Sequence, residues 1–167
     1  MNAEYAEFIP GTRYFLTADT RGRGPVFIGE THVDLLRRAL RGEMVRHPFE
    51  IEAWVIMPNH VHMIWRLPDG DVDVAGRWRS ACRAVASMMG VSTADDLWHP
   101  RLKERVLSNK DEWKRHLDRV HADPVRHGVA GHPREWPHSS YRSCLAKGWV
   151  FEDAVSGSGA TEAFAWA

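Results

Sequence analysis

The sequence contains few cysteines, no long apolar segment and no excess of either charge. Cys82 and Cys144 are too few for a disulfide framework and lack the paired spacing of a zinc site, a usage typical of a reducing cytosol. No apolar run approaches the roughly 20 residues that span a bilayer, and residues 1–12 lack the basic and apolar regions of a secretory signal. We therefore expect a cytoplasmic protein that has no membrane partner.

The distribution of charge is uneven although its sum is zero. The 22 basic and 22 acidic residues cancel, which excludes a uniformly cationic surface. Residues 101–149 nevertheless hold eleven Lys or Arg against six Asp or Glu, whereas residues 150–167 hold three acids and no base. The length and the 44% hydrophobic content predict one domain over residues 1–149. We expect residues 150–167 to form an acidic, small-residue tail that is loosely ordered or docks as a strap.

Hydrophobic periodicity predicts an alternation of strands and helices. The segment 49–67 is apolar on both faces, which is typical of two central strands joined by a tight turn at Pro58-Asn59 or of one long bulged strand. The last long helix is expected to end near Asp123 because Pro124 follows. The other predicted elements are a strand over 13–20, a helix over 30–46, a helix over 75–89, a strand over 105–108 and a helix from about 111. This order indicates an α+β fold in which helices pack on an antiparallel sheet.

A His-x-His pair lies within the second half of the apolar segment. Alternate side chains of a strand share a face, so His60 and His62 are expected to point the same way, roughly 6 to 7 Å apart. Two imidazoles at that spacing can bind one divalent ion. The alternative is that both are half-buried polar residues of the sheet.

Four segments together carry a resemblance to a known family. They are residues 54–65 (WVIMPNHVHMIW), 98–101 (WHPR), 123–128 (DPVRHG) and 136–141 (WPHSSY), within a similarity that runs in order from about Arg13 to Trp149. In these segments the chain resembles the IS200-like single-tyrosine transposases of the HUH endonuclease group, and most closely the REP-associated tyrosine transposases.

The resemblance implies a fold, a substrate and a metal. The fold is a ferredoxin-like antiparallel sheet flanked by helices, and the substrate is single-stranded DNA that forms a hairpin. The paired histidines, here His60 and His62, hold Mg²⁺ or Mn²⁺ against the scissile phosphate, and a helical tyrosine attacks it in DNA strand cleavage and transfer. Since two imidazoles are a poor complete site for Mg²⁺, a third ligand is expected, and Asp123 matches the polar residue four positions after that tyrosine.

The sequence departs from the family at the nucleophile itself. The family typically reads Asp-Tyr-Ile-His-x-Asn-Pro-Val, whereas this chain has Arg119 at the position of the tyrosine, and a guanidinium cannot attack phosphorus. Tyr5, Tyr14 and Tyr141 remain, but none stands at that position. Arg119 either binds a phosphate at the catalytic site or forms a surface ion pair with Asp123.

Three functions follow from this departure. The chain is a DNA-cleaving and rejoining transposase, a catalytically inactive protein that binds DNA hairpins, or a metal-dependent phosphodiester hydrolase that uses water. We expect either a monomer or a homodimer, because related proteins occur in both states.

The locally basic segment supplies the predicted contacts to DNA phosphates. Scattered solvated charge is the competing interpretation. Trp98 and Trp136 flank this segment, where they either pack in the core or stack on unpaired bases. The predicted DNA-binding residues are Arg101, Lys103, Arg105, Lys114, Arg115 and Arg126.

Overall fold

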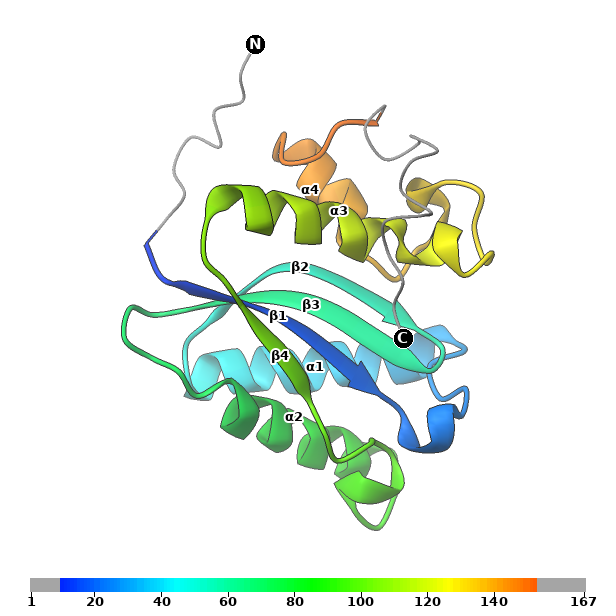
Figure 1. The fold of residues 1–167 in the computed structure, drawn as a ribbon. Coiled ribbons are helices and arrows are strands. Elements are labelled where there is room, and N and C mark those ends of the chain that lie inside the picture. Colours follow the sequence, from blue (N-terminus) through cyan, green and yellow to red (C-terminus); the bar gives the residue numbers. More distant parts are fainter. Residues whose placement is uncertain (1–9, 153–167) are drawn as a thin grey trace.

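The structure, a computed structural model, describes residues 10–152 as a four-stranded antiparallel sheet with helices on both faces (Figure 1). The strands lie in the order β2-β3-β1-β4. The elements in chain order are β1 (Thr12–Asp19), η1 (Arg21–Arg23), α1 (Glu30–Arg46), β2 (Glu50–Met57), β3 (His60–Leu67), α2 (Val74–Met88), η2 (Ala94–Asp96), β4 (Lys103–Leu107), α3 (Lys110–Arg126), η3 (Pro133–Glu135) and α4 (Tyr141–Ala146). The predicted α+β fold, an antiparallel sheet flanked by helices, is confirmed.

The apolar segment 49–67 forms two strands, as the first alternative predicted. β2 and β3 pair antiparallel around the turn at Pro58-Asn59, and β3 also pairs with β1 along its whole length, from Leu67 to His60. β2 contains an irregularity between Ile51 and Ala53, which directs Glu52 as well as Ala53 toward the same side of the sheet.

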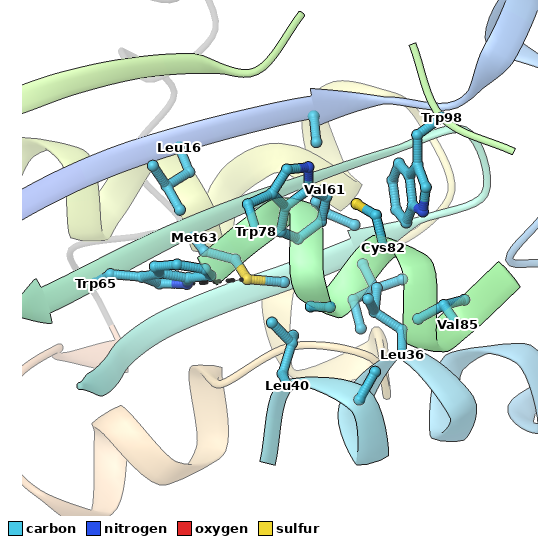
Figure 2. Packing of buried hydrophobic residues seen from close by; sticks show 14 of the residues in the cluster. Leu16, Leu36, Leu40, Val61, Met63, Trp65, Trp78, Cys82, Val85 and Trp98 are labelled. Atoms are coloured by element: carbon cyan, nitrogen blue, oxygen red, sulfur yellow. Dashed lines mark hydrogen bonds between the residues drawn. The ribbon is translucent and has the colours of Figure 1, made fainter. Parts of the chain in front are cut away.

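One face of the sheet is covered by α1 and α2. Along β3 the odd-numbered residues Val61, Met63 and Trp65 face these helices and are buried. They pack against side chains such as Leu36 of α1 and Trp78 of α2, and the Trp65 indole N–H donates to the Met63 sulfur (Figure 2). Each fully buried side chain of this size stabilises the fold by about 1.5–3 kcal/mol.

The opposite face is covered by α3 and α4 (Figure 1). Ile64 of β3 and Phe15 of β1 pack there with Leu117 of α3. By the same alternation, the even-numbered residues His60 and His62 of β3 also point to this side. His60 and His62 therefore lie on the face of the sheet that α3 covers.

α3 is longer than the sequence analysis predicted. The expected end near Asp123 is wrong, because Pro124 lies inside the helix, which continues to Arg126. A proline two residues before the end of the helix removes a single backbone donor, and the last turn closes normally, with the His127 N–H donating to the Asp123 carbonyl at 2.9 Å. Asp123 therefore lies in the final turn of a continuous helix.

The two tryptophans that flank the basic segment, Trp98 and Trp136, both contact the folded core. Trp98 is 3% exposed and packs against Phe27 and Trp78, with ring centroids 5.3 and 5.0 Å away. Its ring faces are therefore covered, and the alternative in which it stacks on an unpaired base is wrong. Trp136 is half-buried and donates from its indole N–H to the Ile56 carbonyl at 3.1 Å.

The C-terminal tail predicted over 150–167 is described only at its start. Val150 is buried with the α3-side core, and residues 153–167 lie outside the described residues. The division into a domain and a tail stays a prediction. Within residues 10–152, no helix has both the length and the apolar character needed to cross a membrane.

Candidate metal centre

Three polar side chains from two elements meet between the sheet and α3. His60 and His62 come from β3, and Asp123 comes from the last turn of α3. One ligand atom from each of these residues lies within 4.8 Å of the others, and all three residues are buried. The structure thus brings together the three residues that the sequence analysis singled out as ligands.

Asp123 is fully buried, but its two oxygens are in different environments. Oδ2 lies 2.7 Å from Nε2 of His60. Among the described residues Oδ1 has no hydrogen-bond partner, and it lies 3.6 Å from Nε2 of His62. Burial alone would raise the pKa of the Asp123 carboxyl, but the two imidazoles outweigh it and hold that pKa below its usual range. The carboxylate is therefore charged and has an oxygen that another group can contact.

His60 contacts oxygen atoms through both ring nitrogens. Nδ1 lies 2.7 Å from the Asn59 side-chain oxygen, and Nε2 faces Asp123. The Asn59 contact leaves Nε2 as the ligand atom.

His62 is oriented in a similar way from the neighbouring strand. Its Nδ1 lies 2.9 Å from the Thr17 hydroxyl, the residue opposite His62 in the β1–β3 register. Burial lowers the pKa of His62 and so favours the neutral imidazole, which is the form that binds metals.

The donor set fits a divalent cation. Two imidazole nitrogens and a charged carboxylate converge, and each imidazole is oriented through its other nitrogen. One carboxylate oxygen accepts no hydrogen bond from the part of the chain that the structure describes. Imidazole suits Mn²⁺ better than Mg²⁺, which prefers oxygen ligands. Of the two ions expected from the sequence, Mn²⁺ therefore fits these residues better.

The two histidines lie in the wall of a cavity of about 390 Å³. Its wall also carries four cationic side chains and two acidic ones, Asp19 and Glu104. The cationic residues are Arg23, Lys103, Arg105 and Arg119. A buried cluster that opens into a largely cationic cavity can be reached by a phosphate group from solvent.

Arg119 lies on α3 one helical turn before Asp123 and lines this cavity. Its guanidinium carbon is 5.9 Å from the centre of the Phe15 ring. Burial, with the positive charges of Arg105 and Arg126, lowers the pKa of Arg119, although a guanidinium remains protonated at neutral pH. Asp123 is fully buried, so the ion pair expected between Arg119 and Asp123 is not a surface one, although the charge of Asp123 still acts on the guanidinium.

The six predicted DNA-binding residues lie in different places relative to this cavity. Lys103 and Arg105 of β4 line it, and Arg101 lies in an adjoining surface hollow that Lys103 shares. Arg126 has a guanidinium nitrogen 3.9 Å from Asp123. Lys114 instead pairs with Asp118 along α3, and Arg115 is exposed on the same helix. That these residues bind DNA stays a prediction.

The tyrosines of the described region are not placed for nucleophilic attack. Tyr14 is 5% exposed in the core beside α1 and α2, and Tyr141 is 1% exposed between α4 and the sheet. Tyr5 lies outside the described residues.

The sequence analysis did not predict three residues that lie next to the cluster. Asn59 was visible only as part of the turn, and Thr17 becomes a neighbour of His62 through strand register, which the sequence does not specify. His127 has its Nε2 3.3 Å from Oδ1 of Asp123. Residues four apart lie on the same side of a helix, so the spacing of His127 from Asp123 could have indicated that they are neighbours. The sequence analysis expected the helix to end near Asp123 and therefore did not consider His127.

Comparison with known proteins identifies relatives over nearly the whole chain, although no protein-family model matches it. A REP-associated tyrosine transposase of Escherichia coli (strain K12) is 33% identical over 147 residues, which cover 87% of each chain. A protein of Haemophilus influenzae is 25% identical over 146 residues, 81% of this chain and 82% of its own. A solved structure of a REP-associated tyrosine transposase bound to a REP hairpin superimposes with a TM-score of 0.81 at 31% identity, covering 95% of this chain and 92% of that one.

Proposed function

Since the chain belongs to the family of REP-associated tyrosine transposases, we propose that it binds single-stranded DNA folded into a hairpin and holds a divalent ion against the DNA backbone. Support for the hairpin comes from the similar solved structure, whose protein is bound to a REP hairpin. Support for the ion comes from the convergence of His60, His62 and Asp123. The observation that carries the proposal is that this cluster opens into a cavity with four cationic side chains.

The residues of the cluster have distinct roles in this proposal. His60 and His62 bind the ion through Nε2, and Asp123 supplies the negative charge. Asn59 and Thr17 hold the two rings in place through Nδ1. When bound, Mn²⁺ or Mg²⁺ supplies positive charge that stabilises negative charge developing on a phosphate oxygen.

Arg119 gives the chain a different role from that of a covalent transposase. A tyrosine at this position would attack phosphorus, whereas a guanidinium donates hydrogen bonds to phosphate oxygens, often two at once. The proximity of Arg105 and Arg126 favours an anion beside Arg119, because a phosphate offsets the repulsion among the three positive charges. We infer that Arg119 binds a backbone phosphate next to the ion and that the chain binds hairpins without forming a covalent adduct.

Binding is tested with fluorescently labelled single-stranded DNA. We expect a hairpin from a REP sequence to bind more tightly than an unstructured strand of the same length, with an affinity that falls as salt rises. Arg119→Ala should weaken binding more than Arg38→Ala, a control that removes an exposed arginine of α1 on the opposite face of the sheet. Equal affinities for the hairpin and the unstructured strand would contradict the proposal.

The covalent step is tested by incubating the protein with hairpin DNA and Mn²⁺ and measuring adducts that survive SDS. We expect no adduct with the unmodified chain and an adduct with Arg119→Tyr, because that change restores a nucleophile one turn from Asp123. Arg38→Tyr, at an exposed position of α1 on the opposite face of the sheet, is the control and should form none. An adduct formed by the unmodified chain would show that it is an active transposase, for which Tyr5 would then be the first nucleophile to test.

Hydrolysis by metal-activated water is a second candidate. The observation in its favour is that the ligand cluster is complete, and includes a carboxylate, although the tyrosine is replaced. This function requires cut strands with free ends and no adduct, and the loss of cutting in His60→Ala. Intact DNA after prolonged incubation with Mn²⁺ would exclude it.

The remaining expectations are part of the same proposal. Arg101, Lys103, Arg105, Lys114, Arg115 and Arg126 are proposed contacts to DNA phosphates. We also propose a single domain over residues 1–149 that works as a monomer or a homodimer.

A further inference from the structure

We propose that His127 is a fourth ligand of the metal centre and that it shifts the ion preference from Mg²⁺ toward ions such as Co²⁺ and Zn²⁺. The inference rests on the proposed function, because it requires His60, His62 and Asp123 to bind an ion. It goes further by assigning a role to His127, which directly follows α3.

The first support is the position of the ring. His127 caps the C-terminus of α3, four residues after Asp123, and so lies on the same side of the helix. Its ring centroid is 5.0 Å from that of His60, and both residues line the same cavity. Its side chain is 36% exposed, so it approaches the buried cluster from the solvent side.

The second support is the spacing around one carboxylate oxygen. Oδ1 of Asp123 lies 3.3 Å from Nε2 of His127 and 3.6 Å from Nε2 of His62, and it forms no hydrogen bond with any described residue. An ion with tetrahedral bonds of about 2.0–2.1 Å keeps its ligand atoms about 3.4 Å apart. The two distances are close to the edges of such a coordination shell and longer than most hydrogen bonds, which have a mode of about 2.9 Å. His127 itself lies outside the group of three residues whose ligand atoms are all within 4.8 Å of one another, so the proposal requires its half-exposed ring to turn toward the ion.

The chemical types of the ligands determine which divalent ion the site binds most tightly. Three imidazoles and one carboxylate form a nitrogen-rich set, which suits Zn²⁺ and Co²⁺, whereas Mg²⁺ prefers oxygen ligands. Without His127 the remaining ligands are two imidazoles and a carboxylate, which discriminate less. His127 therefore increases the ratio of Co²⁺ affinity to Mg²⁺ affinity.

The test is a titration of the full chain with Co²⁺, followed by its visible absorption, with Mg²⁺ as competitor. A four-coordinate Co²⁺ site absorbs much more strongly than a six-coordinate one, so the spectrum reports coordination without any activity assay. We expect the intense spectrum for the unmodified chain. His127→Ala and His127→Asn should both weaken the absorption and lower the Co²⁺ affinity at least about tenfold, with a smaller change for Mg²⁺.

The control is His99→Ala, which removes an exposed histidine outside the cluster and should leave the spectrum unchanged. Both His127 variants are checked for folding by circular dichroism. An unchanged spectrum and affinity in the folded His127 variants, together with loss of binding in His60→Ala, would overturn the role of His127 and leave the proposed metal centre standing. Failure of the unmodified chain to bind Co²⁺ would overturn both.

Discussion

Two buried carboxylates lie at opposite ends of the interface between α3 and the sheet, and their partners differ. Glu52 contacts Trp113 near the start of the helix, and Asp123 belongs to its last turn. Glu52 accepts hydrogen bonds from Arg13, Arg66 and the Trp113 indole, with donors at 2.8 to 3.2 Å. Both oxygens of Glu52 are therefore satisfied by fixed donors.

Within residues 10–152, Asp123 has no such set of donors. One of its oxygens contacts His60, and the other has only longer contacts, to His62, His127 and Arg126. Guanidinium groups neutralise a carboxylate permanently, whereas imidazoles offer lone pairs that can bind an ion. The comparison teaches that the partners of a buried acid, rather than its burial, distinguish a structural cluster from a candidate ligand site.

The largest expected effect comes from breaking the structural cluster. Glu52→Ala leaves Arg13, which is 3% exposed, without its buried carboxylate partner, and should lower the free energy of unfolding by about 3–5 kcal/mol. The measurement is urea denaturation. Glu50→Ala, an exposed glutamate of the same strand, is the control and should change the stability by about 0.5 kcal/mol or less. Similar losses in both variants would show that the Glu52 cluster has no special role.

The second-largest effect is the stabilisation of the folded chain by an ion that binds the cluster of His60, His62 and Asp123. Mn²⁺ at about 100 times its dissociation constant should raise the free energy of unfolding by about 2.7 kcal/mol, because it binds the folded chain. His60→Ala should abolish this increment. His116→Gln should keep it, since His116 lines the cavity but does not belong to the cluster. An increment that survives in His60→Ala would place the ion elsewhere.

Replacing each of the two buried carboxylates, Asp123 and Glu52, by its amide compares their roles in binding the ion. Asp123→Asn should weaken Mn²⁺ binding about tenfold, or about 1.4 kcal/mol, because an amide oxygen lacks the charge of a carboxylate. Glu52→Gln should leave the Mn²⁺ affinity unchanged, since its carboxylate lies at the other end of α3. Calorimetric titration measures both. Equal losses of affinity would mean that the two clusters are coupled through the helix.

The smallest effect tests the contact between the partly exposed Asp71 and the buried Arg77. Hydrogen bonds from Arg77 lower the pKa of Asp71 to about 2, from 3.8. The folded state thus favours the carboxylate, so this stabilisation is present above about pH 3.8 and is lost as the pH falls toward 2. Asp71 is 30% exposed, and solvent limits the effect to about 1 kcal/mol or less.

The measurement compares the stability of the unmodified chain and Asp71→Asn at pH 5 and near pH 2. The difference between them should shrink at the lower pH, whereas Asp69→Asn, an exposed neighbour, should behave like the unmodified chain at both. A difference that is the same at both pH values would show that the contact with Arg77 contributes no pH dependence.

Much of the fold was predictable because local patterns specify it. Alternation along β3 was sufficient to place His60 and His62 on one face, and periodicity defined α1 over the residues where it forms. The end of α3 was not predictable from Pro124 alone, because contacts with the sheet outweigh the loss of one backbone hydrogen bond.

The surroundings of the site depend on features that a single sequence does not specify. Thr17 reaches His62 only through the register of β1 against β3, and Glu52 turns toward α3 at an irregularity in β2. His127 comes near Asp123 only because the helix continues past Pro124. The ligands were therefore predictable, but most of the residues that orient or complete them were not.

The most direct test of the metal centre is the anomalous scattering of crystals soaked in Mn²⁺. We predict a peak bonded to Nε2 of His60, Nε2 of His62 and the carboxylate of Asp123, inside the cavity that Arg119 lines. Absence of a peak at that point, with His60 still hydrogen-bonded directly to Asp123 at saturating Mn²⁺, would contradict the account.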